Sequence, residues 1–488
     1  MKTAVNFATR LESAIGASRV FADPSVCLEY AVDEIAPAVA TRPSTAEQAA
    51  EIVRFAALEK LALIPSGHRT KLEMGMPPSR YDIALDMTGL HEIAHHDPGD
   101  LTVSVDAGAS FNDLAAPLYK QKQFLPLSVP FYFESTIGGI IASGVDSSLR
   151  HAYGTARDFL IGAEFVDGTG RLCKSGGRVV KNVTGYDLHK LLIGSLGTLA
   201  VITRLNFRTF PAAPASVGFV ISFRTPEDAL AFGNLVERSP LRPTSIDLVS
   251  PELLRLFLEA AKSSSEPPAT PLPGKLSAAS WHFCVSIEGS EEVCERACRE
   301  LARLVLTPNT KHTQFITLRE SEGADLWHYI GQFIPLLLEA SPLAAIFRIS
   351  LLPGRLAPLL GGLRILGEQA SLPHAFFARA CGVLYFALLP AADDAATRYR
   401  LAEAASAVFS KCAEENASAS LPWCPTQCKK EVNVWGLDSA MSASNRNQAG
   451  RRFPPLAPAS ARADLALMRR LKSAFDPQNL FAPGRFPL

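Results

Sequence analysis

Short apolar runs alternate with helix-like spacing of apolar residues through the first 210 positions. The runs are four to seven residues long, which suits buried strands, and they lie at residues 61–65, 83–87, 101–105, 160–166 and 199–202. Apolar residues recur at helical spacing in residues 44–60 and 111–121. This mixture predicts an α+β domain over residues 36–212, preceded by an N-terminal segment, residues 1–35.

The helix expected at residues 44–60 has a specific start signal. Ser44 is a good N-cap residue, and Glu47 lies three positions later, where its side chain can complete a capping box. We therefore expect Ser44 to cap this helix, with the strand at residues 61–65 following directly.

The second half of the chain mixes the same two patterns. The expected strands are residues 217–223, 281–287, 345–352 and 383–389, and the expected helices are residues 226–237, 291–305, 357–369 and 397–412. Their order predicts a second α+β domain, residues 213–430, built as a sheet with helices on one face. Pro211–Pro214 would form a hinge, residues 263–273 an exposed insertion, and residues 431–488 a C-terminal segment.

Three loops of the first domain are rich in small residues. Ser66–Lys71, residues 136–144 and Gly194–Thr198 each stand beside a predicted strand. Glycine has no Cβ, so backbone in such loops can approach a flat or phosphorylated ligand, and turn amides with Arg69 or Lys71 can hold a phosphate. Tight turns between core elements would use the same residue types. No loop has the spacing of a dinucleotide-binding G-x-G-x-x-G or Walker A motif.

These segments together resemble the vanillyl-alcohol-oxidase type of FAD-binding domain, also called the PCMH type. The matching sequences are PSGHRT at residues 65–70, STIGGIIASG at residues 135–144 and KNVTGYDLHKLLIGSLGTLAVIT at residues 181–203. The sequence from Phe475 to Arg485 also resembles the family's ending. The closest likeness is to the flavin subunits of bacterial glycolate oxidase. The resemblance implies FAD bound between two α+β subdomains, plus an α+β cap domain.

The resemblance also assigns contacts with FAD. The first segment would hold the pyrophosphate, the second would lie along the flavin and ribityl chain, and the third would line the far side near the adenine and ring edges. The matching positions are Pro65, Ser66, Gly67, His68, Arg69, Thr70, Lys71, Thr136, Gly138, Gly139, Ser143, Gly144, Gly197, Thr198 and Ile202.

Three departures from the family pattern refine these expectations. His68 is one position out of register with the histidine that bonds FAD covalently in some relatives, so we expect non-covalent FAD. Leu196 stands where the larger, catalytic glycolate oxidase subunit usually has glutamate, which is more similar to the smaller FAD-binding subunit. The catalytic subunit also usually carries a Gly-Asp-Gly-Asn-x-His metal motif, which this sequence lacks, and we expect no metal.

The catalytic residues stay open at this point. The base is unknown, and His151, Tyr153 and His189 are the candidates. Arg348 is a charge inside an apolar strand, where it could bind a substrate carboxylate with two parallel hydrogen bonds, or lie at a sheet edge and reach water. Cys424-Pro425-Thr426-Gln427-Cys428 has no second Cys or His pair at zinc spacing, so we expect unligated thiols.

Composition narrows the class of protein. The 48 basic residues balance 48 acidic residues, which gives no electrostatic case for nucleic acid or an anionic membrane as a partner. The sequence contains no run of about 18 apolar residues, so we expect no transmembrane segment. The N-terminus lacks the apolar stretch of a signal peptide, so we expect no signal peptide. Nine widely spaced cysteines suit reduced thiols. We expect a cytoplasmic protein, which a partner could hold at the inner membrane.

The family resemblance implies the function of a glycolate-oxidase-like FAD-dependent oxidoreductase subunit. It would oxidise a small 2-hydroxy acid by hydride transfer to flavin. Its partners would be a catalytic flavin subunit and an iron–sulfur subunit, because the chain has no cluster-type cysteine spacing. A non-catalytic partner that holds FAD or supports assembly is the alternative, which Leu196 and the missing metal motif favour. A stand-alone oxidase of an alcohol or carbohydrate that uses oxygen is a third interpretation.

Overall fold

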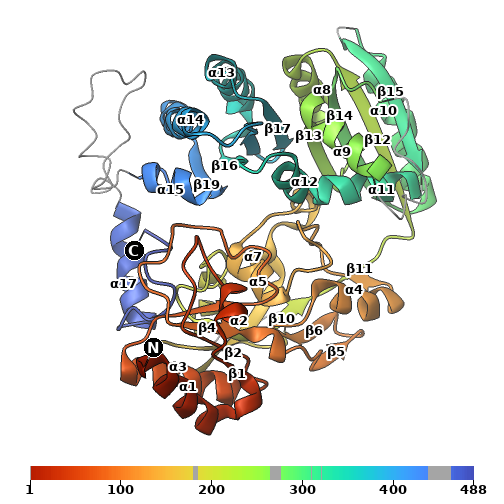
Figure 1. The fold of residues 1–488 in the computed structure, drawn as a ribbon. Coiled ribbons are helices and arrows are strands. Elements are labelled where there is room, and N and C mark those ends of the chain that lie inside the picture. The colour runs from red at the N-terminus through yellow and green to blue at the C-terminus, as the bar shows by residue number, and fades with distance from the viewer. Residues whose placement is uncertain are drawn as a thin grey trace. The chain divides into compact units, whose positions relative to one another are not determined.

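The computed structural model describes residues 2–179, 185–263, 276–308, 310–319, 321–437 and 463–487. These residues form two compact units (Figure 1). Unit 1 takes its described residues from Met1–Asp146, Thr155–Ala212 and Pro458–Leu488, and unit 2 from Ser147–Gly154 and Ala213–Ala457. Residues 147–154 therefore cluster with unit 2, although they lie in the range predicted for the first domain. The insertion expected at residues 263–273 lies outside the described residues except for Ser263.

Unit 1 is built from short helices and strands. Its elements are α1 (Lys2–Ile15), β1 (Val20–Phe21), α2 (Pro24–Leu28), β2 (Val39–Thr41), α3 (Ala46–Glu59), β3 (Leu63–Ser66), β4 (Ile83–Asp86), β5 (His95–Asp97), β6 (Thr102–Asp106), α4 (Phe111–Lys120), β7 (Gln123–Phe124), α5 (Ile137–Ser143), α7 (Ala156–Phe159), β8 (Leu160–Val166), β9 (Leu172–Gly176), β10 (Val201–Arg208), β11 (Phe210–Pro211) and α17 (Ala463–Phe475).

Two sheets divide unit 1 into two α+β subdomains. The first has the strand order β1-β2-β4-β3, with β2 and β3 parallel to β4. The second is antiparallel, with the order β5-β6-β10-β8-β9. Strands β7 and β11 form a separate two-stranded ribbon. The α+β class and the pair of subdomains that the sequence predicts are thus confirmed.

Each sheet has an apolar core of its own. Helix α3 buries Ile52 and Val53 against Leu63 and Ile83 of the parallel sheet. Helix α5 buries Ile137, Ile140 and Ile141 in the core of the antiparallel sheet. Burial of such side chains is worth about 1.5–3 kcal/mol each. The two cores hold the loops that follow β3 and precede α5 in fixed positions.

The cap of α3 is one residue later than predicted. Thr45, not Ser44, is the N-cap, and its hydroxyl accepts from the amide of Gln48 at 3.2 Å. The Gln48 side chain in turn accepts from the amide of Ser44 at 2.9 Å. Ser44 and Thr45 each have a hydroxyl that can cap the helix. The capping-box spacing to Glu47 favours Ser44, whereas the structure uses Thr45. The helix still leads directly into β3.

A buried ion pair fixes the C-terminal segment in unit 1. Lys472 of α17 donates to the Asp476 carboxylate at 2.6 Å and to the carbonyls of Thr198 at 2.7 Å and Phe481 at 2.9 Å. Asp476 also accepts from the amides of Leu480 and Phe481. Because every charge in this group has a partner, the segment can be buried at modest cost.

Unit 2 is built on one large sheet. Its elements are α6 (Arg150–Tyr153), β12 (Ala215–Phe223), α8 (Pro226–Arg238), β13 (Ser245–Val249), α9 (Pro251–Ser263), β14 (Trp281–Gly289), α10 (Glu291–Val305), β15 (His312–Arg319), α11 (Ser321–Gly331), α12 (Phe333–Ala340), β16 (Ala345–Ser350), α13 (Leu356–Gln369), β17 (His374–Arg379), β18 (Val383–Leu388), α14 (Ala395–Glu414), β19 (Ser418–Trp423) and α15 (Thr426–Glu431).

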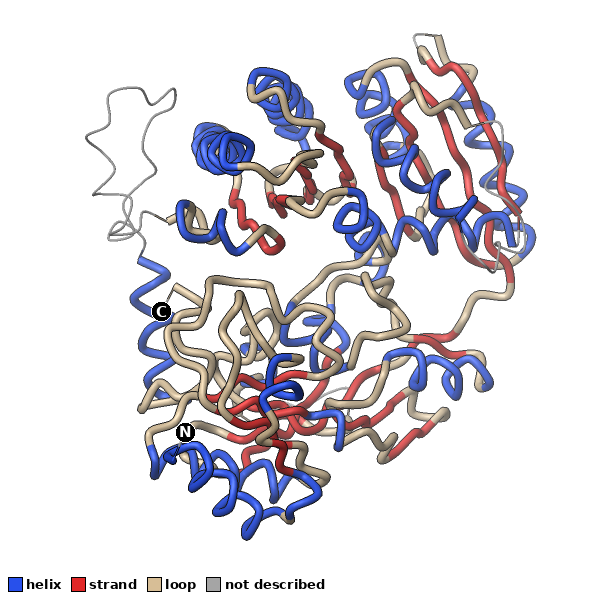
Figure 2. Tube along the Cα trace, viewed as in Figure 1, coloured by secondary structure: helices blue, strands red, loops and turns tan. Residues whose placement is uncertain are grey.

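The sheet of unit 2 has eight antiparallel strands in the order β15-β12-β14-β13-β17-β18-β16-β19. Figure 2 draws the strands in red and the helices in blue. The prediction of helices on one face is wrong. Successive residues Tyr385 and Phe386 of β18 point to opposite faces. Phe333 of α12 lies 4.8 Å from Tyr385, whereas Phe409 of α14 contacts Phe347, the cross-strand partner of Phe386. Helices therefore cover both faces. The prediction failed because the sequence pattern did not reveal α9, α11 and α12.

No helix among the described residues is long and apolar enough to span a bilayer.

Candidate functional site

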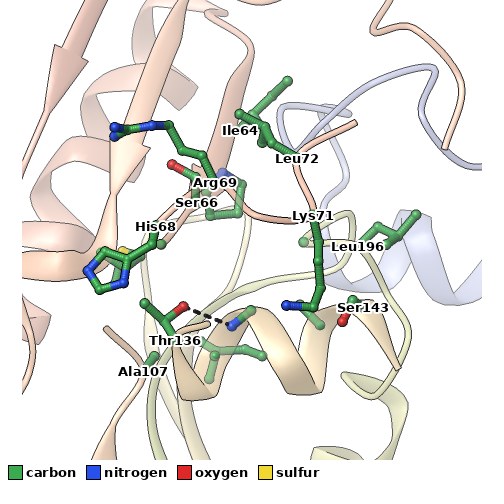
Figure 3. Close-up of a pocket in the computed structure, with 18 of the residues that line it drawn as sticks. Ile64, Ser66, His68, Arg69, Lys71, Leu72, Ala107, Thr136, Ser143 and Leu196 are labelled. Atoms are coloured by element: carbon green, nitrogen blue, oxygen red, sulfur yellow. Dashed lines mark hydrogen bonds between the residues drawn. The ribbon is translucent and has the colours of Figure 1, made fainter. Parts of the chain in front are cut away.

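Three segments that lie far apart in the sequence of unit 1 surround one cavity. It holds about 770 Å³ of empty space, counting its open mouth. Residues of the turn after β3, of α5 and of the loop before β10 line it, together with Arg485 (Figure 3). All the positions assigned to FAD by resemblance line this cavity except Gly144 and Thr198. The structure adds residues that the sequence did not assign to FAD: Ile64, Leu72, Met87, Ala107, Ala142, Leu196 and Ala200.

The turn after β3 packs its backbone against α5. A Cβ on Gly67 would lie 2.0 Å from the Thr136 Oγ1, so only glycine fits there. Arg69 has a φ of +66°, which places the turn in the left-handed region. The backbone amides of residues 68–71 donate no hydrogen bond among the described residues. Unpaired amides of this kind form an anion-binding concavity, which suits a phosphorylated ligand.

Most of the small-residue loop expected at residues 136–144 is the helix α5, Ile137–Ser143. Thr136 caps α5, and its hydroxyl accepts from the amide of Gly139 at 3.3 Å. A Cβ on Gly138 would lie 2.8 Å from Ala107, which explains the glycine. The Gly138 amide donates to the Ala107 carbonyl at 2.7 Å. The first amides of α5 are thus already paired, and the unpaired amides belong to the turn.

The loop before β10 forms the opposite wall. A Cβ on Gly197, which has a φ of +68°, would lie 2.7 Å from the Pro65 Cγ. Leu196 also has a positive φ, +52°, which costs a side chain about 1–2 kcal/mol. Its amide donates to the Ala142 carbonyl at 2.8 Å, and its side chain lines the cavity. A strained leucine at a cavity wall indicates a constraint on the shape of the site.

The two assigned positions that do not line the cavity support its wall. The Thr198 hydroxyl donates to the Ser195 carbonyl at 2.6 Å, so it closes its own loop. A Cβ on Gly144 would lie 2.9 Å from the Gly194 Cα, which brings the end of α5 against this loop. Thr198 therefore supports the loop through its hydroxyl, and Gly144 supports it through close backbone packing.

Arg485 is a cavity residue that the sequence did not assign. Its guanidinium donates to the carbonyl of Leu72 at 2.5 Å and to that of Met74. Burial lowers its pKa to about 10. The Met76 amide donates in return to the Arg485 carbonyl at 3.1 Å. The resemblance of residues 475–485 to a family ending was the available signal, and the structure shows that this ending holds the turn in place.

His68 is held at the rim of the turn. Its Nδ1 lies 2.7 Å from the carbonyl oxygen of Glu134, so Nδ1 carries the proton and donates.

The candidate base in unit 1, His189, lies away from the cavity. Its Nδ1 is 3.0 Å from the Ser175 hydroxyl, and its ring is buried. Burial lowers the pKa of His189. His189 is not among the cavity residues, and its environment is that of a structural histidine.

The other candidates belong to unit 2. Half-buried His151 lies in α6, and burial lowers its pKa. Tyr153 donates to the Glu288 carboxylate at 3.3 Å, and burial raises the Tyr153 pKa to about 12. Arg348 lies opposite Tyr385 and Ser420 on β16. Since β16 lies between β18 and β19, Arg348 is not on an edge strand.

Potential metal ligands do not cluster among the described residues. No group of three or more His, Cys, Asp or Glu side chains in that part of the chain is arranged to hold a metal ion. Cys424 and Cys428 are both buried.

Comparison with known families identifies the two parts of the chain. Residues 37–176 match the family described as FAD binding domain. Residues 213–420 and 455–486 match the family described as FAD linked oxidases, C-terminal domain.

Several characterised proteins are similar in sequence. A D-lactate dehydrogenase from Anaerostipes hadrus is 28% identical over 49% of this chain and 52% of that protein. Glycolate oxidase subunit GlcE from Escherichia coli (strain K12) is 34% identical over 34% of this chain and 47% of that protein. Both matches span about half of the relative. Glycolate oxidase subunit GlcD from Bacillus subtilis (strain 168) is 22% identical over 92% of this chain and 88% of that protein.

Solved structures share the whole fold at low identity. p-Cresol methylhydroxylase with substrate bound has a TM-score of 0.73 at 16% identity, covering 99% of this chain and 97% of that chain. 4-Ethylphenol oxidase from Gulosibacter chungangensis has a TM-score of 0.72 at 15% identity, covering 99% of this chain and 96% of that chain.

The cavity suits the cofactor that these families name. Glycines hold backbone close to the space on two walls, and the turn offers unpaired amides that can bind an anion. The matched domains, the fold and the cavity agree, and the chain belongs to the FAD-linked oxidoreductases with a PCMH-type FAD-binding domain and has FAD as its cofactor.

Proposed function

We propose that this chain is a subunit of a glycolate-oxidase-like enzyme that oxidises a small 2-hydroxy acid. The observation that carries the proposal is the cavity of unit 1, where unpaired turn amides and glycine-lined walls suit FAD. The substrate class comes from relatives named glycolate oxidase subunits and D-lactate dehydrogenases. The first of these matches span only about half of each relative. The activity of the complete relatives is therefore proposed for this chain.

Each wall of the cavity has a part in holding FAD. The amides of residues 68–71 would bind the pyrophosphate, with Pro65, Ser66 and Gly67 bringing the backbone close. Thr136, Gly138, Gly139 and Ser143 would lie along the flavin and ribityl chain. Gly197 and Ile202 would form the far wall, while Gly144 and Thr198 support it from behind.

Bound FAD would supply a two-electron acceptor for the substrate hydride. The chain must then provide a base for the hydroxyl proton and a partner for the carboxylate. His151 is the better candidate for the base, because its lowered pKa keeps the imidazole neutral and able to accept a proton near pH 7. Tyr153, with a raised pKa, stays protonated and acts as a donor. Arg348 is the candidate for the carboxylate, through its forked guanidinium.

Partner subunits would receive the electrons. Relatives named as glycolate oxidase subunits support an assembly with a catalytic flavin subunit and an iron–sulfur subunit. The nine cysteines are present as thiols, which supports a reducing compartment such as the cytoplasm, with a partner holding the complex at the inner membrane.

A non-catalytic role is the second candidate function. Leu196 gives the cavity an apolar wall where the catalytic subunit of the family usually has glutamate. The described residues also contain no cluster of potential metal ligands. On this interpretation the chain holds FAD and supports assembly, while a partner oxidises the substrate.

A visible absorption spectrum of the purified chain, reconstituted with FAD, tests both candidates. Anaerobic addition of glycolate, D-lactate or D-2-hydroxyglutarate should bleach the flavin if this chain oxidises the substrate itself. Flavin that stays oxidised with all three acids supports the assembly role. Hydrogen peroxide release under air would favour a stand-alone oxidase instead. A chain that binds no FAD would contradict the proposal.

A further inference from the structure

Two basic residues of the turn after β3 point in different directions. The Arg69 guanidinium lies 4.6 Å from the Tyr30 ring and 3.6 Å from the Glu29 carboxylate, so its charge already has partners. The Lys71 amine lies 2.5 Å from the Ser135 hydroxyl and 3.1 Å from the Thr70 hydroxyl. Figure 3 shows Lys71 reaching toward α5 and Ser143, while Arg69 extends the opposite way.

The surroundings of Lys71 contain no partner of opposite charge among the described residues. Its hydrogen-bond acceptors are neutral hydroxyls, and the Phe131 ring lies 5.5 Å from its nitrogen. Burial lowers the pKa of Lys71 to about 7, while the charge of the Glu134 carboxylate acts in the opposite direction. A partly buried amine with no salt-bridge partner is costly to keep charged. An anionic group placed in the cavity would remove that cost.

We propose that Lys71, and not Arg69, supplies the positive charge that meets the FAD pyrophosphate. The proposal rests on the placement of FAD given above, with the pyrophosphate at the turn amides of residues 68–71. The amides fix the position of the phosphates, and the ammonium adds a charge-assisted hydrogen bond. Arg69 instead holds the outer side of the turn against Tyr30 and Glu29.

The proposal has a consequence for pH. Without FAD, Lys71 loses its proton near pH 7, whereas beside a diphosphate it keeps the proton to higher pH. FAD binding above pH 7 therefore takes up a proton, and affinity falls as pH rises. The slope is up to tenfold in Kd for each pH unit between the two pKa values of Lys71. Each phosphate of the FAD pyrophosphate keeps one negative charge throughout this range.

Other ionisable side chains belong to the turn and to the segments around Lys71. His68 is an ionisable side chain on the same turn, with its Nδ1 2.7 Å from the carbonyl oxygen of Glu134. Exposed Glu134 comes from the segment before α5, and Glu73 is exposed at the end of the turn. Arg485, from the C-terminal segment, has a pKa of about 10 and stays charged below pH 9. Helix α5 and the Leu196 loop bring no titratable side chain to the cavity. His68 is therefore the group that needs a control.

The test is the Kd of FAD, measured by flavin fluorescence at constant ionic strength from pH 6 to pH 9. The Kd of the unaltered chain should rise steadily above pH 7. Lys71→Met should weaken binding about 10- to 100-fold at pH 6.5, the range for one hydrogen bond to a charged group, and should leave the Kd independent of pH. Lys71→Arg, charged at every pH, should bind with a flat profile near the affinity of the unaltered chain at pH 6.5.

Matched variants separate this role from others. Arg69→Met removes the neighbouring charge but keeps the turn amide, and it should lose clearly less affinity for FAD than Lys71→Met at pH 6.5. His68→Gln should keep the pH slope. Thermal unfolding without FAD identifies any variant that fails to fold. If Lys71→Met fails to fold, the pH profiles of the unaltered chain and of Lys71→Arg test the proposal.

The proposal is overturned by a flat profile in the unaltered chain, by a slope that disappears in His68→Gln, or by equal losses in Arg69→Met and Lys71→Met. In each case FAD still binds, so the proposed function survives. If the unaltered chain binds no FAD at any pH, the proposed function fails together with this inference.

Discussion

The cavity of unit 1 and the sheet of unit 2 are built in different ways. The cavity is made largely by backbone, since Gly67, Gly138 and Gly197 stand where any Cβ would meet a neighbour within 3 Å. The sheet of unit 2 holds its polar groups through side chains, such as Tyr153 on Glu288 and His282 on Ser222. A site made by backbone can be predicted from the positions where glycine is required. A site made by side chains depends on contacts between residues that sequence spacing does not reveal.

The largest expected effect concerns the ion pair that holds the C-terminal segment in unit 1. Lys472→Met leaves the buried Asp476 carboxylate without its cation, which typically costs about 3–5 kcal/mol. Urea unfolding measures the loss. Because the same segment carries Arg485 into the cavity, FAD affinity should fall as well. The matched control is Arg364→Met in an exposed pair with Glu368 of unit 2, expected to cost less than about 0.5 kcal/mol. Equal losses in the two variants would contradict this account of the segment.

Acid should weaken unit 2 through His282. Burial lowers the pKa of His282 to about 4 from an ordinary 6.5, so the unfolded chain binds the proton more readily. Stability is therefore full above pH 6.5 and falls as pH drops toward 4, by about 3 kcal/mol at most. His282→Gln should remove this part of the pH dependence in urea unfolding. If the unaltered chain and the variant lose stability in parallel between pH 6.5 and 4, the buried histidine is not the cause.

The backbone of the cavity wall is tested by Gly67→Ala. The added Cβ meets the Thr136 side chain, which caps α5, so the turn and the helix must separate. We expect about 1–3 kcal/mol of destabilisation and at least a tenfold loss of FAD affinity, measured by unfolding and by flavin fluorescence. A variant that binds FAD as tightly as the unaltered chain would show that the turn does not lie against the cofactor.

The smallest expected effect is a gain in stability in unit 2, opposite in sign to the effect of Gly67→Ala in unit 1. Gly361 lies inside α13 of unit 2, with no atom within 4 Å of an added Cβ. Gly361→Ala should therefore stabilise unit 2 by about 0.5–1 kcal/mol, because alanine is the better helix former. Thermal unfolding measures the gain. Destabilisation here would mean that glycine serves α13 in a way that the structure does not show.

Patterns of apolar residues predicted the regular elements well where packing and local preference agree. Strand β8 and helix α10 have the predicted bounds, Leu160–Val166 and Glu291–Val305. Helix α5 was not predicted, because its glycines have low helix propensity and its stability comes from the Thr136 cap and from packing. Helices α9, α11 and α12 were missed as well, and with them the second covered face of the sheet.

For the site, glycine-rich loops and family resemblance led to the residues around the cavity. Leu196 was noted only as a departure, since a positive φ at leucine cannot be anticipated from composition. Arg485 was not assigned, because its contacts with Leu72 and Met74 join residues more than 400 positions apart. That these residues bind FAD stays a prediction, as do the candidates His151, Tyr153, His189 and Arg348 for catalysis.

A crystal structure of the chain with FAD tests the central claim most directly. We predict non-covalent FAD in the cavity of unit 1, with pyrophosphate oxygens about 2.7–3.2 Å from backbone amides of residues 68–71. FAD bound elsewhere, or with its pyrophosphate away from this turn, would contradict the account.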